Sequence, residues 1–103
     1  MKLIFSENAW DDYLYWQRTD RKLLEKINTL IKEVQRTPFE GIGKPEPLKY
    51  GFPGYWSRRI NSEHRMVYKI DGDSLNIAQL RYRYFRYGRH QSSAPPAQAT
   101  RRR

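Results

Sequence analysis

The hydrophobic positions of this chain follow a helical period in its first third and a period of two further along. The run KLIF (Lys2–Phe5) is short and apolar and predicts a first strand. Ser6 can then cap a helix by accepting a bond from a free backbone N–H, and the helix dipole favours Glu7 in the first turn. The expected apolar stripe of this helix follows the spacing i, i+3, i+4, i+7 and comprises Trp10, Tyr13, Leu14 and Gln17.

A second, longer helix is predicted to open at Thr19 and Asp20 and to end before Pro38. It has the strongest helical period in the chain. This spacing is more typical of a core face than of an interaction surface. Its apolar residues are Leu23, Leu24, Ile27, Leu30, Ile31 and Val34.

The stretch 38–54 holds four prolines and four glycines and predicts a structured loop, with room for one short strand near Leu48 and Lys49. Beyond it, alternation predicts an antiparallel meander of three strands. These strands are Tyr55–Ile60, Arg65–Ile70 and Ser74–Tyr84, with turns at 61–64 and 71–73. The fold class expected is α+β, with two N-terminal helices packed on a four- to five-stranded antiparallel sheet.

A length of 103 residues predicts one domain, and we place it at residues 1–84. Residues 85–103 are poor in apolar side chains and rich in Ser, Ala, Pro and Gln, so we expect a disordered basic extension. The chain has no cysteine, which rules out disulfides and thiolate metal sites. Nothing in the sequence reads as a signal peptide or a membrane span, so a cytoplasmic location is expected.

Basic charge accumulates toward the end of the chain. Residues 1–40 carry seven bases and seven acids, residues 41–84 carry eight bases and four acids, and residues 85–103 carry five arginines and no acid. The net charge is +9. Such a distribution favours a polyanion as partner, although a solubilising surface with a basic tail would show the same composition.

The sequence has no Walker loop, no HExxH motif and no GxGxxG after a strand, and two histidines are too few for a histidine metal centre. What remains is a group of charged residues in or beside the predicted sheet. Several guanidinium groups at one sheet edge repel one another unless an anion joins them, and phosphate fits that need. The group is Glu46, Lys49, Arg58, Arg59, Glu63, Arg65, Arg81 and Arg83.

Metal-free cleavage of RNA needs a group that removes the 2′-hydroxyl proton and cations that stabilise the charged phosphorane. A carboxylate such as Glu46 suits the first task and arginine the second. Strand parity would place Arg81 and Arg83 on one face and Tyr82 and Tyr84 on the other, where tyrosine can stack on an unpaired base. The alternative is that Glu46 is a surface carboxylate paired with a neighbouring lysine.

Read together, several stretches resemble the YoeB (Txe/YoeB) toxins of the RelE superfamily of bacterial toxin–antitoxin systems. The resemblance covers residues 1–84 almost without gaps. The segments that carry it are WDDYLYWQRTD (Trp10–Asp20), RTPFEGIGKPEPLK (Arg36–Lys49), GYWSRRI (Gly54–Ile60), EHRMVY (Glu63–Tyr68) and LRYRY (Leu80–Tyr84).

The resemblance implies a microbial-ribonuclease-like fold and cleavage of mRNA in the ribosomal A site. The implied reaction uses no metal or other cofactor and leaves a 2′,3′-cyclic phosphate and a 5′-hydroxyl. It also implies a cognate, YefM-like antitoxin that holds the toxin inactive and through which alone the complex reaches operator DNA. A homodimer is a further candidate assembly, and no membrane partner is expected.

By position, Glu46 resembles the family's general base and Arg65 the residue that stabilises the phosphate transition state. Lys49 and Arg59 would be auxiliary cations near the phosphate, and Tyr84 would orient the substrate. Arg81 is a further candidate for phosphate binding.

The sequence departs from the family pattern at Arg83, where the family pattern R-Y-H-Y has a histidine that protonates the leaving 5′-oxygen. Arginine cannot readily donate and recover a proton near neutral pH. Three hypotheses follow. In the first, the protein still cleaves RNA, with Arg83 stabilising charge and water or another group protonating the leaving oxygen. In the second, His90 folds back as the acid. In the third, the chain is a catalytically weakened protein that binds RNA or antitoxin.

Overall fold

Two helices and a five-stranded sheet make up the described part of this computed structural model, residues 1–49 and 51–86. Tyr50 and residues 87–103 lie outside the described residues, and with them His90 and most of the extension predicted to be disordered. In chain order the elements are β1 (Lys2–Phe5), α1 (Glu7–Thr19), α2 (Arg21–Arg36), β2 (Glu46–Pro47), β3 (Tyr55–Arg59), β4 (Arg65–Asp71) and β5 (Ser74–Gln79).

The strand order in the sheet is β1-β5-β4-β3-β2. The predicted meander is confirmed, because β3, β4 and β5 pair antiparallel in sequence, and β2 adds to β3 in the same sense. The prediction of a purely antiparallel sheet is wrong for β1, which runs parallel to β5. Parallel neighbours need a long connection, and both helices and strands β2 to β4 lie between these two strands in the chain. The sheet is therefore mixed.

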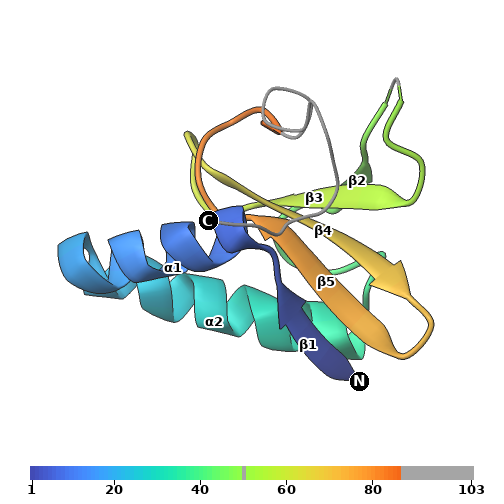
Figure 1. Cartoon of the computed structure of the whole chain (residues 1–103), viewed down its shortest axis with the longest axis horizontal. Coiled ribbons are helices and arrows are strands. Elements are labelled where there is room, and N and C mark those ends of the chain that lie inside the picture. The colour runs from blue at the N-terminus through green and yellow to red at the C-terminus, as the bar shows by residue number, and fades with distance from the viewer. Residues whose placement is uncertain (50, 87–103) are drawn as a thin grey trace.

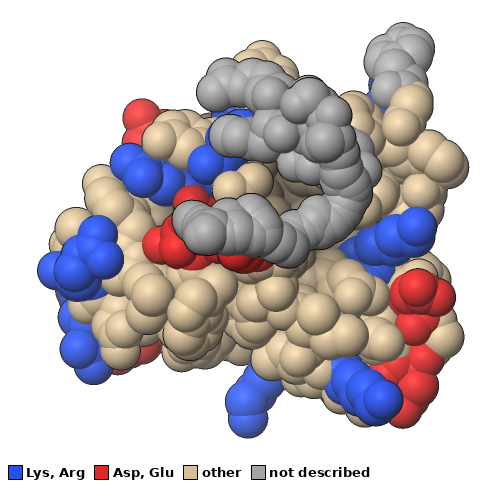
Figure 2. Space-filling model, viewed as in Figure 1, with Lys and Arg blue, Asp and Glu red and all other residues tan. Residues whose placement is uncertain are grey.

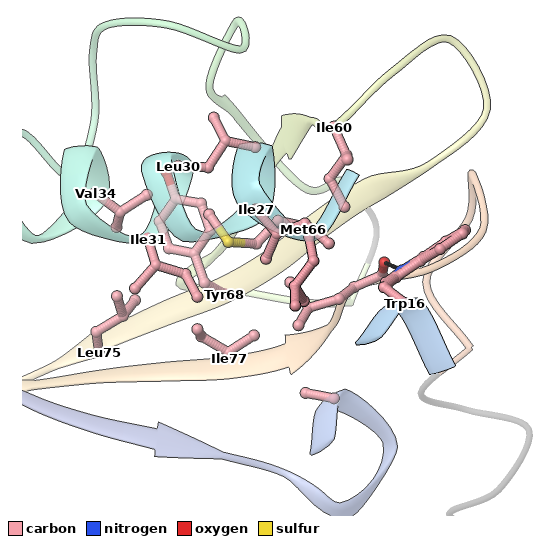
Figure 3. Close-up of a cluster of buried hydrophobic side chains, with 13 residues drawn as sticks. Trp16, Ile27, Leu30, Ile31, Val34, Ile60, Met66, Tyr68, Leu75 and Ile77 are labelled. Atoms are coloured by element: carbon pink, nitrogen blue, oxygen red, sulfur yellow. Dashed lines mark hydrogen bonds between the residues drawn. The ribbon is translucent and has the colours of Figure 1, made fainter. Parts of the chain in front are cut away.

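Both helices lie on one side of the sheet (Figure 1), and the core fills the space between them and the strands. The apolar stripe predicted for α2 is confirmed: Leu24, Ile27, Leu30, Ile31 and Val34 are buried, and Leu23 packs against them. From the sheet, Met66, Tyr68, Leu75 and Ile77 point into the same cluster (Figure 3).

The face predicted for α1 is only partly right, because Tyr13 packs against the core but Trp10 does not. The buried residues of this helix are Ala9, Asp12 and Trp16, whereas Trp10 is 47% exposed. The exposed ring of Trp10 lies nearly parallel to that of the half-buried Tyr13, 5.6 Å away. An aromatic ring with a polar edge is stable at a surface, so Trp10 did not mark the core. The caps were predicted correctly: Ser6 accepts from the Ala9 N–H and Asp20 from the Leu23 N–H.

The last strand is shorter than predicted, because β5 ends at Gln79 and residues 80–84 form bends. Helix α1 holds both backbone groups of Leu80: Asp12 Oδ2 accepts its N–H at 3.0 Å and Trp16 Nε1 donates to its carbonyl at 2.8 Å. Tyr82 then takes a positive φ of 75°. The strand parity expected for residues 81–84 therefore does not apply.

Among the described residues, no helix is both long enough and apolar enough to cross a membrane.

Candidate active site

The candidate site lies on the face of the sheet that is turned away from the helices. Glu46 is opposite Ser57, Ser57 is opposite Val67, and Arg59 is opposite Arg65 across the β2–β3–β4 ladder. Residues opposite one another, and residues two apart on one strand, share a face. Glu46, Arg59 and Arg65 therefore point to the same side, which we call the open face.

Arg65 is the electrostatic centre of this face. Burial lowers the pKa of its guanidinium, and the positive charges of Arg59 and Arg83 lower it further, while Glu46 and Tyr84 raise it. These four residues therefore lie close enough to Arg65 to act on it. Five of the seven residues predicted for the site are brought together: Glu46, Arg59, Arg65, Arg83 and Tyr84.

A tight turn fixes the direction of the Arg65 side chain. Its Nη1 donates to the carbonyls of Asn61, at 2.8 Å, and His64, at 3.1 Å. Asn61 Oδ1 in turn accepts the backbone N–H groups of Glu63 and His64, each at 2.8 Å. Backbone carbonyls thus hold the guanidinium at Nη1. Among the described residues its Nε and Nη2 make no such bond and can donate to an anion.

Lys49 and Arg81 are placed differently from these five. Lys49 is exposed and is not among the main groups that shift the pKa of Arg65. The Arg81 guanidinium lies 3.7 Å from the centre of the Tyr15 ring and acts on His64 and Asp12. Roles for both in phosphate binding remain predictions.

Arg58, which belonged to the charged group in the sequence, is not on the open face. It is completely buried, and its guanidinium donates to the carbonyls of Thr37, Glu40 and Ile42, while Tyr68 accepts from its Nε at 3.3 Å. Arg58 thus holds the loop between α2 and β2, the loop that leads into Glu46.

A shallow pocket of about 410 Å³ adjoins the site on the side of α2. Three cations line it, Lys26, Lys44 and Arg59, together with the apolar side chains of Leu30 and Ile42. Gly43 forms its rim with a φ of 83°, and a Cβ there would meet Leu30 and the Arg59 carbonyl at 3.2 Å. Arg59 thus lines this pocket as well as belonging to the open face.

On the part of the molecule that is visible in Figure 2, Lys and Arg side chains lie at several separate places and form no single patch. In the part of the chain that the structure describes, no group of three His, Asp or Glu side chains could hold a metal ion.

Three residues near the site were missed from the sequence: Asp12, His64 and Gln79. Asp12 Oδ2 forms an ion pair with Arg86 at 2.6 Å, His64 Nδ1 accepts the Tyr82 N–H at 2.8 Å, and Gln79 bonds to Tyr84 and Arg86. Asp12 and Arg86 are 74 residues apart. The only signal was the i, i+4 spacing of Asp12 and Trp16 on one helix.

Comparison with known proteins places the chain in a family. The model of the "YoeB-like toxin of bacterial type II toxin-antitoxin system" matches residues 5–84. The chain belongs to this family. It is 64% identical over 84 residues to Toxin YoeB of Escherichia coli K12, which covers 82% of this chain and 100% of the relative. Phe85 and the residues after it lie outside the family match.

Solved structures of YoeB proteins have the same fold. The YoeB/ParE toxin from Agrobacterium tumefaciens is 55% identical, covers 82% of this chain and 100% of its own, and gives a TM-score of 0.79. Two further structures come from Staphylococcus aureus: a YoeB dimer, with a TM-score of 0.78, and a heterotetrameric YoeB–YefM toxin–antitoxin complex, with a TM-score of 0.75. The matched chain in each is 48% identical and covers 82% of this chain and 98% of its own. The two helices packed on a five-stranded mixed sheet are thus the YoeB architecture.

Proposed function

We propose that this YoeB-family chain is a metal-independent endoribonuclease that cleaves mRNA in the ribosomal A site and so inhibits translation. The observation that supports it best is that Glu46, Arg59 and Arg65 share the open face. Arg83 and Tyr84 follow Tyr82, whose carbonyl accepts the Arg65 N–H, and they act on the charge of Arg65. One base and several fixed cations are the groups that phosphodiester transfer without a metal requires.

In the proposed reaction, the Glu46 carboxylate takes the proton of the 2′-hydroxyl, and the 2′-oxygen attacks the adjacent phosphorus. The P–O5′ bond breaks as the new bond forms, which gives a 2′,3′-cyclic phosphate and a 5′-oxygen leaving group. Arg65 and Arg59 stabilise the negative charge that builds on the phosphorane oxygens. Tyr84 is 78% exposed beside Arg65, in a position suited to hold a base or sugar.

Arg83 stands where the family pattern has a histidine, and it acts on Arg65 as a second positive charge. Since its guanidinium stays protonated, it contributes charge and not a proton. Water then protonates the leaving 5′-oxygen. Because the general acid supplies part of the rate, we expect cleavage that is slower than with a histidine at this position.

The experiment that tests this function maps mRNA ends in a translation reaction containing the wild-type protein or Glu46→Gln. Cuts inside the A-site codon that disappear in the variant are expected. Glu25→Gln is the matched control, because Glu25 is an exposed carboxylate on α2 and no role in the site is proposed for it. A wild-type protein that leaves ribosome-bound mRNA intact would overturn the proposal.

A second candidate function is binding without effective chemistry, and the identity of Arg83 is the observation that favours it. Such a protein would bind ribosomes and antitoxin but would leave mRNA intact. Ribosome binding without new mRNA ends is the result that would select it.

The S. aureus complex with YefM and the YoeB dimer suggest this chain's partners. We infer that a YefM-like antitoxin binds this toxin and that operator DNA is reached only through it. For self-association we infer a homodimer formed through the outer surface of α1 and β1, where Trp10 and Ile4 are 47% and 45% exposed. Sedimentation of the antitoxin-free protein, with Trp10→Ala as the comparison, tests the second inference.

A further inference from the structure

The segment Tyr84–Arg86 crosses the open face, where the side chain of Gln79 holds it. Gln79 is opposite Val67, and the β4–β5 register shifts between Val67 and Tyr68. In that shift Ala78 is the unpaired residue, and Gln79 comes to lie on the side of Val67 and not on the core side of Tyr68. Gln79 is nevertheless only 1% exposed, so something covers it.

The cover is the backbone of the last described residues. Gln79 Nε2 donates to the Tyr84 carbonyl at 2.8 Å, and Gln79 Oε1 accepts the Arg86 N–H at 2.9 Å. One side-chain amide thus satisfies a carbonyl and an N–H two residues apart, as a neighbouring strand would. Between these two bonds, the Phe85 ring lies 5.1 Å from that of Phe52 and 5.3 Å from that of Tyr55.

The Arg86 side chain closes the arrangement. Its Nε donates to Gln79 Oε1 at 3.1 Å and its Nη2 to Asp12 Oδ2 at 2.6 Å. Asp12 is 4% exposed and also accepts the Leu80 N–H. Arg86 therefore joins the two ends of the bend 80–86, because it binds the carboxylate that holds the first residue and the amide that holds the last.

Arg83 and Tyr84 lie inside this bend. Between its ends the backbone is fixed at Tyr82, whose N–H is accepted by His64 Nδ1 and whose carbonyl accepts the Arg65 N–H at 3.0 Å. Without Arg86 and Gln79, the end of the bend beyond Arg83 and Tyr84 would lose the four hydrogen bonds that join it to Gln79 and Asp12. Both Arg83 and Tyr84 act on Arg65, and the bonds of Gln79 and Arg86 close the bend in which they lie.

We propose that Arg86, with Gln79 and Asp12 as its partners, is a positioning residue for the candidate active site. It is supplied by the segment outside the family match, and it holds Arg83 and Tyr84 beside Arg65. The link between Arg86 and catalysis rests on the proposed nuclease function. The role of Arg86 in holding the bend is independent of that function and can be measured separately.

The test uses the full-length protein with Arg86→Ala, Arg86→Lys and Gln79→Ala, and with Arg21→Ala as the matched control for loss of one exposed positive charge. The first measurement is backbone amide hydrogen exchange at Leu80 and Tyr82. Faster exchange is expected in Arg86→Ala and Gln79→Ala, unchanged exchange in Arg21→Ala, and partial protection in Arg86→Lys, which keeps the charge opposite Asp12.

The second measurement is the rate of mRNA cleavage on programmed ribosomes. Because a small displacement of catalytic groups is costly, Arg86→Ala should lower kcat by about 10- to 100-fold and leave KM within about twofold. Arg86→Lys should recover part of kcat. A change in KM alone would mean that Arg86 contacts RNA directly, and it would overturn the positioning role.

Unchanged exchange at Leu80 and Tyr82 in Arg86→Ala would overturn the proposal whatever the cleavage rate. Faster exchange with an unchanged kcat would overturn its link to the site. If the wild-type protein itself does not cleave mRNA, the proposed function fails, and the exchange measurement alone then decides whether Arg86 holds the bend.

Discussion

Arg65 is the residue on which the candidate site converges, since carbonyls of its own turn fix one edge of its guanidinium and three charged neighbours act on the rest. Arg59 and Arg83 repel it, and Glu46 attracts it. An arrangement with more positive than negative charge costs free energy until an anion binds. A phosphate group is the ligand that best relieves this repulsion.

The side chain at position 83 should control the rate of the proposed RNA cleavage. We predict that Arg83→His raises the cleavage rate at neutral pH at least about tenfold, because histidine can donate a proton to the 5′-oxygen and arginine cannot. Single-turnover cleavage of programmed ribosomes between pH 5.5 and 8.5 measures it, and the gain should shrink as the new histidine deprotonates. An equal rate in both proteins would mean that leaving-group protonation does not limit cleavage.

His64 couples the bend to pH. Burial lowers the pKa of His64, and Arg81 and Arg65 lower it as well, while Glu63 and Asp12 raise it. Its Nδ1 can accept the Tyr82 N–H only when unprotonated. Since the folded pKa lies below the unfolded value of 6.5, the folded state binds fewer protons. Its contribution to stability is therefore present above about pH 6.5 and is lost as the pH falls through the folded pKa.

We predict that the free energy of unfolding falls between pH 7 and pH 5 in the wild-type protein and falls less in His64→Gln. Glutamine keeps an oxygen that can accept the Tyr82 N–H but does not titrate in this range. Urea unfolding at a series of pH values measures the difference. Parallel pH curves for the two proteins would contradict the role of His64.

At the scale of elements, the loop between α2 and β2 depends on one buried side chain. The Arg58 guanidinium satisfies three loop carbonyls, and Tyr68 adds a bond to the carbonyl of Pro38 at 2.6 Å. We predict that Arg58→Met lowers the free energy of unfolding by about 2–4 kcal/mol, because buried carbonyls lose their donors. Thermal and urea unfolding measure it.

The neighbouring Arg59→Met is the matched control, because it removes the same side chain from the exposed side of the same strand. It should change the free energy of unfolding by no more than about 0.5 kcal/mol and should lower cleavage. Equal losses of stability in both variants would contradict the assignment of Arg58 to the loop and Arg59 to the site.

Some helices and strands could be predicted from the sequence and others could not. The period of α2 and the alternation of β3 and β4 come from local packing, and both were predicted correctly. The end of β5 was not, because Asp12 and Trp16 take both backbone groups of Leu80 from 68 and 64 residues away. Alternating Arg and Tyr after Gln79 has the pattern of a strand whether or not a strand partner exists.

Some residues of the candidate site could likewise be predicted from the sequence and others could not. The positions of Glu46 and Arg65 followed from a long, specific resemblance, and the structure places both on one face. Gln79 and Arg86 could not be found this way, since Arg86 lies outside the matched segment and Gln79 reaches the open face only through the register shift at Ala78. Neither the shift nor the contact between them has a local sequence pattern.

At the scale of the whole molecule, charge is divided between the described fold and the end of the chain. Of the net charge of +9, four positive charges belong to the arginines at positions 89, 101, 102 and 103, beyond the bend that Arg86 closes. Arginines that bind phosphate release counterions, so their contribution to affinity depends on salt. The contribution of Arg86 to positioning depends on contacts in a partly buried network and is screened much less.

Removal of residues 87–103 should therefore separate binding from catalysis. We predict that a chain ending at Arg86 keeps its kcat on saturating ribosomes. Its ribosome affinity should depend less steeply on salt, by up to about 0.7 in the logarithmic slope for each phosphate-bound arginine removed. The same chain lacks His90, so a large loss of kcat would support His90 as the acid and contradict the assignment of leaving-group protonation to water.

A further cut after Tyr84 should lower kcat itself, because it removes Phe85 and Arg86 and with them the closure of the bend.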